Sequence, residues 1–340
     1  MNRQLALPGA LVLSLDFELH WGVRDRHTPT SPYHANLLGA RQVIPSLLEL
    51  FEKTQIAATW ATVGFLLARS RDELHAYSPT ARPAYANRHL DPYAEPLGAD
   101  ENDDPLHYAP SLVRRILETP YQELGTHTFS HYYCGEPGQT ADAFRADLAA
   151  ACRIAAAWGA PVRSIVFPRN QRDAAYDVIL LDHGIDVYRG NPLSWMWRFR
   201  NTRESDGRVQ RLARLLDSYA GPPGSDLQRW DEVPQPSGLA DVRATALLRP
   251  YAPRARSLER RRFERVVGRI REAARTGRIC HLWWHPHNFG AHQQENLDVL
   301  RAVLRVAEEE RARRGLLSLT MAGAADLARR EAISLAGSTA

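Results

Sequence analysis

The 340-residue chain is poor in features that would each have indicated a particular class of protein. Its cysteines are odd in number and far apart (Cys134, Cys152 and Cys280), which excludes a disulfide framework and favours a reducing compartment. No stretch approaches the roughly 20 apolar residues of a transmembrane helix, so we expect no stable membrane insertion. Because the N-terminus lacks the long apolar segment of a secretory signal, we expect a cytoplasmic location.

Lysine is also nearly absent: Lys53 is the only one, and the other basic residues are arginines. The net charge of +4 would indicate a nucleic-acid-binding protein if the basic residues formed an unbalanced patch. Instead they alternate with acidic residues, as in 257–278, where Glu and Arg recur at helical spacing. We therefore expect a solvated helix there and no nucleic-acid partner.

What the chain does contain is an alternation of strand-like and helix-like segments along its whole length. Amphipathic helical patterns recur, as in 140–160, where Thr140 is the expected N-cap and Gly159 the expected C-terminal stop. This order predicts an α/β fold, a distorted (β/α) barrel with about seven parallel strands. The strand-like segments are 9–21, 56–64, 121–131, 163–170, 186–190, 277–285 and the start of 316–330.

Two long segments, at about 79–110 and 190–255, have no clear period. We interpret them as loop insertions in a single domain that covers 1–340, and a long loop in a compact domain is usually functional. The second insertion contains the aromatic stretch 191–200, which could stack on a sugar ring. Tryptophan and methionine are more often packing residues, so this stretch carries little weight.

Polar residues follow several of the predicted strands, at the point where each strand ends. In an α/β fold the carboxyl ends of parallel strands meet at one edge, so these residues would converge on one mouth. The groups are Asp16 and Glu18, His127 and His131, Pro168 with Arg169 and Asn170, and His285 with His287.

His127 and His131 are four residues apart, a spacing that places two imidazoles on the same side of a helical turn. Two neutral imidazoles and one carboxylate leave coordination positions open, as a hydrolytic metal site requires. Cys134 is a less suitable ligand, because thiolates favour closed structural sites. The alternative is that His127 caps backbone groups and His131 is a surface residue.

Asp16 and Glu18 lie at positions i and i+2, which point to the same side of a strand. Two carboxylates held together suit metal ligation combined with general-base catalysis, or the acid and base pair of a glycosidase. The alternative is a solvated strand end, or a helix cap formed by Asp16.

In the segment 280–290, strand alternation places His281, Trp283 and His285 on one face and Trp284 on the other. His285 at the strand tip could protonate a leaving amine, whereas His281 further inside is expected in the core. The alternative is that the whole tryptophan-rich stretch is core.

Several of these segments resemble, in the same order, the motifs of the polysaccharide deacetylase superfamily (NodB homology, carbohydrate esterase family 4). They are "LSLDFE", "ATWATVG", "ELGTHTFSH", "WWHPHNF" and "LLSLTMAGAADL". The resemblance covers roughly residues 9–330, and the histidine motif is its most specific part. It implies a NodB-like barrel.

The resemblance also implies roles for the strand-end residues. His127, His131 and Glu18 would ligate a divalent metal, for which zinc is expected, and Asp16 would be the base. The roles of Asp16 and Glu18 could be reversed, because the family has two adjacent aspartates and this chain has Asp-Phe-Glu. The remaining expected roles are Arg169 as the partner of the base, His285 as the acid with His287 as its competitor, and His287, Asn170 and Trp284 in substrate binding.

The expected activity is metal-dependent hydrolysis of an N-acetyl amide on a sugar or glycan precursor. The partner is then a carbohydrate or another N-acetylated small molecule. The displaced acid and the loosely matching "FPRNQR" indicate a divergent branch, of the kind found with surface-polysaccharide biosynthesis. Two alternatives remain: a hydrolase of C–N bonds in small cyclic amides, and a carbohydrate-binding protein without catalysis. The sequence makes no prediction of the oligomeric state.

Overall fold

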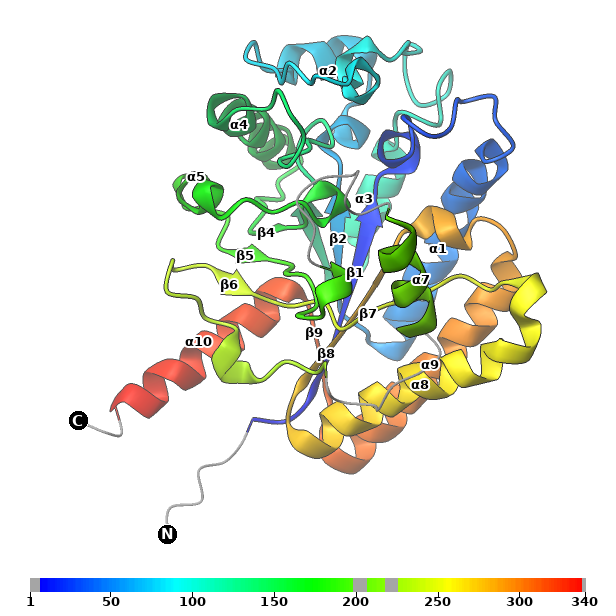
Figure 1. Ribbon diagram of the computed structural model, residues 1–340, viewed down its shortest axis with the longest axis vertical. Coiled ribbons are helices and arrows are strands. Elements are labelled where there is room, and N and C mark those ends of the chain that lie inside the picture. The colour runs from blue at the N-terminus through cyan, green and yellow to red at the C-terminus, as the bar shows by residue number, and fades with distance from the viewer. Residues whose placement is uncertain (1–6, 198–206, 218–225, 338–340) are drawn as a thin grey trace.

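The computed structural model describes residues 7–197, 207–217 and 226–337 (Figure 1). Two parts of the predicted insertion 190–255, namely 198–206 and 218–225, lie outside the described residues. The strands are β1 (Ala10–Phe17), β2 (Ala58–Thr62), β3 (Gln122–Thr126), β4 (Ser164–Ile165), β5 (Val187–Tyr188), β6 (Ala240–Asp241), β7 (Ala246–Leu247), β8 (Ile279–Trp284) and β9 (Leu317–Leu319). The helices are α1 (His34–Thr54), α2 (Arg71–Tyr77), α3 (Pro110–Glu118), α4 (Ala141–Ala157), α5 (Asp177–Asp182), α7 (Arg208–Asp217), α8 (Arg256–Thr276), α9 (Gln293–Arg314) and α10 (Met321–Gly337).

The described strands form one curled sheet in which every pairing is parallel. Its order is β6-β5-β4-β3-β2-β1-β8-β7, and β9 pairs with the first half of β1. The segment 240–248 links the two ends of the sheet, because Val242 N–H donates to β5 at Tyr188 O (2.9 Å) and Thr245 N–H donates to β8 at His281 O (2.8 Å). The predicted distorted (β/α) barrel is confirmed.

All seven predicted strands are present, and helices separate them as the alternation indicated. The insertion at 190–255 is more structured than its irregular sequence predicts, because it contains α7, β6 and β7. Both extra strands are two residues long, too short for any periodicity, and they form only because the neighbouring strands supply hydrogen-bonding partners. Thr140 caps α4 as expected, by accepting a hydrogen bond from Ala143 N–H (3.2 Å).

Strand β1 is buried along its whole length and has two different faces. Leu11, Leu13 and Leu15 belong to the large hydrophobic cluster that includes residues of α1, α8 and α9. Ala10 and Val12 instead belong to a smaller cluster with α10. The face of Ala10 and Val12 continues to Ser14 and Asp16, because side chains alternate along a strand. The interior of the barrel therefore changes from apolar to polar toward the carboxyl end of β1.

Two other predictions concern properties of the chain as a whole. The three cysteines are free thiols, and Cys134 and Cys280 are buried. Within residues 7–197, 207–217 and 226–337, no helix combines the length and the apolar character needed to cross a bilayer.

Candidate active site

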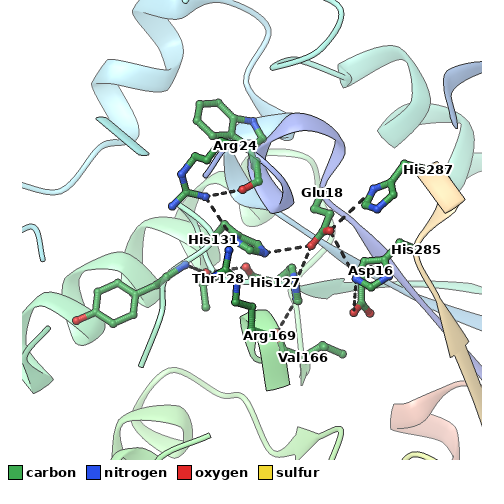
Figure 2. Close-up of polar contacts among 12 residues, drawn as sticks. Asp16, Glu18, Arg24, His127, Thr128, His131, Val166, Arg169, His285 and His287 are labelled. Atoms are coloured by element: carbon green, nitrogen blue, oxygen red, sulfur yellow. Dashed lines mark hydrogen bonds and ion pairs between the residues drawn. The ribbon is translucent and has the colours of Figure 1, made fainter. Parts of the chain in front are cut away.

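Three buried side chains converge where β1 and β3 end (Figure 2). Glu18 directly follows β1, and His127 and His131 follow β3. Oε2 of Glu18 lies 3.3 Å from Nε2 of His127 and 3.0 Å from Nε2 of His131. All three potential ligand atoms lie within 4.8 Å of one another. The structure thus brings the Glu18 carboxylate together with two imidazoles that lie 109 and 113 residues further along the sequence.

The two histidines lie on an irregular loop, not on the helical turn that their spacing predicts. His127 N–H donates to Thr62 O (2.9 Å) at the end of β2, which fixes the start of the loop. Thr128 and His131 then adopt left-handed backbone conformations, with φ of 63° and 57°. Such conformations cost energy in residues other than glycine and are often found at functional sites. The centroids of the two rings nevertheless lie 5.0 Å apart, so the loop places the two imidazoles side by side, as a helical turn would have done.

Asp147 on α4 fixes this loop by hydrogen bonds with two of its residues. Its carboxylate accepts hydrogen bonds from Phe129 N–H (2.8 Å), from Ser130 N–H (3.2 Å) and from the Ser130 hydroxyl. Burial raises the pKa of Asp147 to about 6, although these hydrogen bonds oppose the shift. Two of the three residues between the histidines, Phe129 and Ser130, are therefore fixed by one buried carboxyl group, and we infer that Asp147 is a positioning residue.

The tautomer of His127 is fixed by the backbone. Its Nδ1 lies 2.7 Å from Val166 O, an acceptor, so Nδ1 carries the proton and the Nε2 lone pair faces Glu18. His131 differs, because its Nδ1 lies 3.4 Å from Arg24, whose guanidinium also donates to two backbone carbonyls. Burial lowers the pKa of His131 to about 3, so the ring is neutral. Metal binding through Nε2 of His131 requires its proton to lie on Nδ1, on the side of Arg24.

Glu18 is surrounded by imidazoles. Burial alone would raise its pKa, but the nearby His285 and the close contacts with Nε2 of His127 and His131 hold the pKa well below its usual range. The carboxylate also needs Gly22, since a Cβ at that position would lie 1.9 Å from Cδ of Glu18. Any larger residue at position 22 would displace the Glu18 side chain.

Asp16 has a different environment, on the inner face of β1. Its two oxygens accept a bidentate pair of hydrogen bonds from Arg189, at 2.6 and 2.8 Å. Burial raises the pKa of Asp16, but Arg189 together with the nearby His285 and His127 more than offsets this effect, and the pKa lies below its ordinary value. Arg189 follows β5, so this ion pair crosses the interior of the barrel.

Arg189 also connects Asp16 to residues deeper in the barrel. It donates to Ser14 Oγ (3.0 Å), and Ser14 donates to Nε2 of His281 (2.8 Å). Nδ1 of His281 lies 3.0 Å from Val242 O, which completes the network. His281 is fully buried, as the sequence predicts.

The expected partner of the base, Arg169, has another position. It pairs with Asp25 (2.5 Å), and its guanidinium lies 4.5 Å from the centroid of the Tyr133 ring. The bidentate arginine on Asp16 is Arg189, so we correct the assignment. The signal for Arg189 was present, because it too lies at the end of a predicted strand, in "DVYRG".

His285 and His287 follow β8 and are stacked, with centroids 5.0 Å apart. Nε2 of His285 lies 3.6 Å from Asp16 and 3.5 Å from Glu18, and its side chain is 25% exposed. His287 is buried, its Nδ1 lies 3.9 Å from Glu18, and burial lowers its pKa to about 3. Only His285 of this pair combines exposure with contact to both carboxylates.

A cavity of about 400 Å³ opens over these residues. Asp16, Glu18, His131, His285 and Asn170 contribute to its lining. Asn170 also accepts a hydrogen bond from Arg189 (3.1 Å).

The tryptophan expected in substrate binding requires a correction. Trp284 is fully buried among core residues and packs on Phe51 and Phe289. Trp283 lines the cavity together with Trp197, from the aromatic stretch to which we gave little weight. Strand alternation predicted these opposite faces correctly, but the choice between the neighbouring residues was wrong.

Comparisons with known proteins support the fold. No protein-family model matches the sequence, and no curated protein matches it. The chain is similar in structure to a putative polysaccharide deacetylase from Mycobacterium smegmatis, with a TM-score of 0.53, 13% identity and coverage of 96% of this chain and 94% of that one. It is also similar to the α-amylase AmyC from Thermotoga maritima, with a TM-score of 0.52, 10% identity and coverage of 89% and 72%.

A family 4 carbohydrate esterase from Streptomyces lividans in complex with acetate is more distant, with a TM-score of 0.40, 12% identity and coverage of 92% and 93%; this likeness carries no argument. The fold therefore occurs in proteins with different activities, so function must be inferred from the site. The resemblance to the polysaccharide deacetylase superfamily is confirmed for the fold: this chain has a NodB-like barrel.

Proposed function

We propose that this protein is a metal-dependent N-deacetylase that releases acetate from an N-acetylated sugar or glycan precursor. One observation carries the proposal: Glu18, His127 and His131 lie together, next to Asp16 and His285, beneath one cavity. Two imidazoles and one carboxylate with open positions are the donor set of hydrolytic zinc sites.

The three side chains fit a divalent metal ion, for which we propose zinc. His127 has its Nδ1 bonded to Val166 O and its Nε2 toward Glu18, and burial favours the neutral form of His131, so two imidazoles and the ionised carboxylate of Glu18 face one point. When bound, the ion would polarise the acetyl carbonyl and lower the pKa of a water molecule.

The other residues would handle the protons. Asp16 would accept the proton of the attacking water, and Arg189 would keep the carboxylate oriented and ionised. His285, which lies between Asp16 and Glu18 and reaches the cavity, would donate a proton to the departing nitrogen. The amide C–N bond would break, giving acetate and a free amine.

The pair of carboxylates does not favour glycoside hydrolysis. A glycosidase needs one carboxyl group that stays protonated near neutral pH, with a raised pKa. The pKa of both Asp16 and Glu18 is lowered, by Arg189 and by the surrounding histidines respectively. Neither carboxyl group is therefore suited to protonating a glycosidic oxygen.

The cavity suits a sugar that carries a negative charge. Trp197 and Trp283 line the cavity, and their rings could contact a sugar ring. The arginines of the lining outnumber its two carboxylates: Arg26, Arg169, Arg214 and Arg249. We therefore propose a phosphate-bearing precursor, such as a nucleotide-linked or lipid-linked sugar.

Acetate release is the direct test. Purified protein loaded with zinc is incubated with N-acetylglucosamine, its 1-phosphate and its uridine diphosphate conjugate, and acetate is measured enzymatically. We expect release that a chelator abolishes and that His127→Ala lacks, whereas the exposed His89→Ala variant keeps it. Turnover of hydantoins alone, or sugar binding without turnover, would contradict the proposal in favour of the two alternatives.

A further inference from the structure

A second cluster of potential metal ligands lies outside the candidate active site. It consists of His20, in the short 3-10 turn after β1 (Leu19–Gly22), with Glu95 and His107 from the insertion at 79–110. One nitrogen of each histidine and one oxygen of Glu95 all lie within 4.8 Å of one another. The three residues come from two segments that are far apart in sequence.

The backbone holds these two segments against each other. His20 N–H donates to Leu106 O (3.3 Å), and Nε1 of Trp21 donates to His107 O (3.0 Å). The rings of His20 and His107 meet edge to face, with centroids 4.9 Å apart. The geometry of the cluster is therefore built into the packing of the turn on the insertion.

Three ring nitrogens of this cluster are buried, and within the described part of the chain they have no hydrogen-bond partner. The side chain of His20 is 0% exposed, and His107 is 2% exposed. Among the residues that the structure describes, Nδ1 and Nε2 of His20 and Nε2 of His107 have no hydrogen-bond partner. The nearest oxygen of Glu95 lies 3.8 Å from Nε2 of His20, too far for a hydrogen bond. Buried polar atoms are rarely left unsatisfied, so these nitrogens call for a ligand.

His107 is oriented as metal-binding histidines usually are. Both oxygens of Asp104 lie near its Nδ1, at 2.9 and 2.8 Å, so Nδ1 carries the proton and the Nε2 lone pair faces the cluster. Such carboxylate–histidine pairs fix the tautomer of a ligand and increase its basicity.

We propose that His20, His107 and Glu95 bind a second divalent transition-metal ion, such as zinc. Glu95 also lines a small cavity with Arg71, Arg82 and Tyr93. Because His20 is two residues from Glu18, this ion would tie the insertion at 79–110 to the turn that follows Glu18. The proposal rests on this cluster alone and is independent of the deacetylase reaction.

The number of ions per chain tests this proposal. The full chain is stripped with a chelator, loaded with excess zinc, desalted, and analysed by inductively coupled plasma mass spectrometry. We expect two zinc ions per chain in the wild type, one in His107→Gln and one in His127→Ala. The exposed His89→Ala variant is the matched control and should keep two.

Glu95→Gln is a second, milder variant, in case His107→Gln fails to fold. In the His127→Ala background, zinc should raise the melting temperature, and adding Glu95→Gln should abolish the shift. A wild-type protein that holds no zinc, or variants of His107 and Glu95 that lose no zinc relative to the wild type, would overturn the proposal. Failure of the deacetylase site has a different signature, because His127→Ala would then lose no zinc.

Discussion

Replacing Arg189 with methionine should destabilise the protein. It should also reverse the sign of the contribution that Asp16 makes to the pH dependence of stability. Arg189 and Asp16 are each 3% exposed, and two hydrogen bonds of 2.6 and 2.8 Å join them. Removing one partner of a buried ion pair leaves a buried charge uncompensated, which costs about 3–5 kcal/mol. For 340 residues the unfolding entropy is ~0.7 kcal/mol per degree, so the melting temperature should fall by about 4–7 °C.

The sign of the pH effect follows from the pKa of Asp16. In the wild type that pKa lies below its ordinary value, so the pair stabilises the fold above the unfolded-state pKa and this contribution is lost as pH falls. Without Arg189, the effect of burial is opposed only by the nearby His285 and His127, so the pKa of Asp16 should rise. The variant should therefore recover stability, relative to the wild type, as the pH is lowered from 7 toward 4.

Two controls separate this effect from ordinary loss of a salt bridge. Arg145 pairs with Asp182 at 2.7 Å, but both side chains are about half exposed, so Arg145→Met should cost at most about 1 kcal/mol. The double variant Asp16→Asn/Arg189→Met removes both charges and should recover much of the loss. Thermal unfolding from pH 4 to 8 provides the measurement. The reasoning is refuted if Arg189→Met costs no more than Arg145→Met, or if its stability relative to the wild type decreases as pH falls.

Three further predictions concern neighbouring residues. Trp284→Ala should destabilise the protein by about 3–5 kcal/mol without changing KM, because its ring is fully buried away from the cavity. Trp283→Ala should also destabilise it, but should in addition raise KM, because Trp283 lines the cavity; an unchanged KM for Trp283→Ala would contradict the assigned faces. Since burial raises the pKa of Asp147 to about 6, its contribution to stability should decrease by roughly 3 kcal/mol as pH rises from 4 to 7, and Asp147→Asn should lack this slope in urea titrations. Added salt should raise KM for a phosphate-bearing sugar but not for a neutral one, because arginines line the cavity, and parallel changes in both substrates would argue against an anionic ligand.

The sequence predicts the strands and the strand-end residues well, because both follow from local patterns. The alternating leucines Leu11, Leu13 and Leu15 indicate that β1 is a buried strand. Because the strands are parallel, their carboxyl ends lie at one edge of the sheet, where Glu18 contacts His127. The strands β6 and β7 could not be predicted, since two residues carry no period and their partners belong to distant strands.

The site residues that were missed depend on three-dimensional contacts. Arg169 and Arg189 both follow predicted strands, and only the barrel decides which guanidinium crosses the interior to Asp16. The pairing of His20 with His107 could not be predicted either, because 87 residues separate them and one lies in an aperiodic insertion. Local patterns thus indicate which residues could act, and packing decides which of them meet.

The measurement that tests the central claim most directly compares Glu18→Gln with Asp16→Asn in zinc content and acetate release. If Glu18, His127 and His131 hold the ion and Asp16 is the base, Glu18→Gln loses one zinc ion and all activity. Asp16→Asn then keeps the zinc content of the wild type but releases no acetate. The account is contradicted if Asp16→Asn loses zinc, if Glu18→Gln retains it, or if either variant still releases acetate at the wild-type rate.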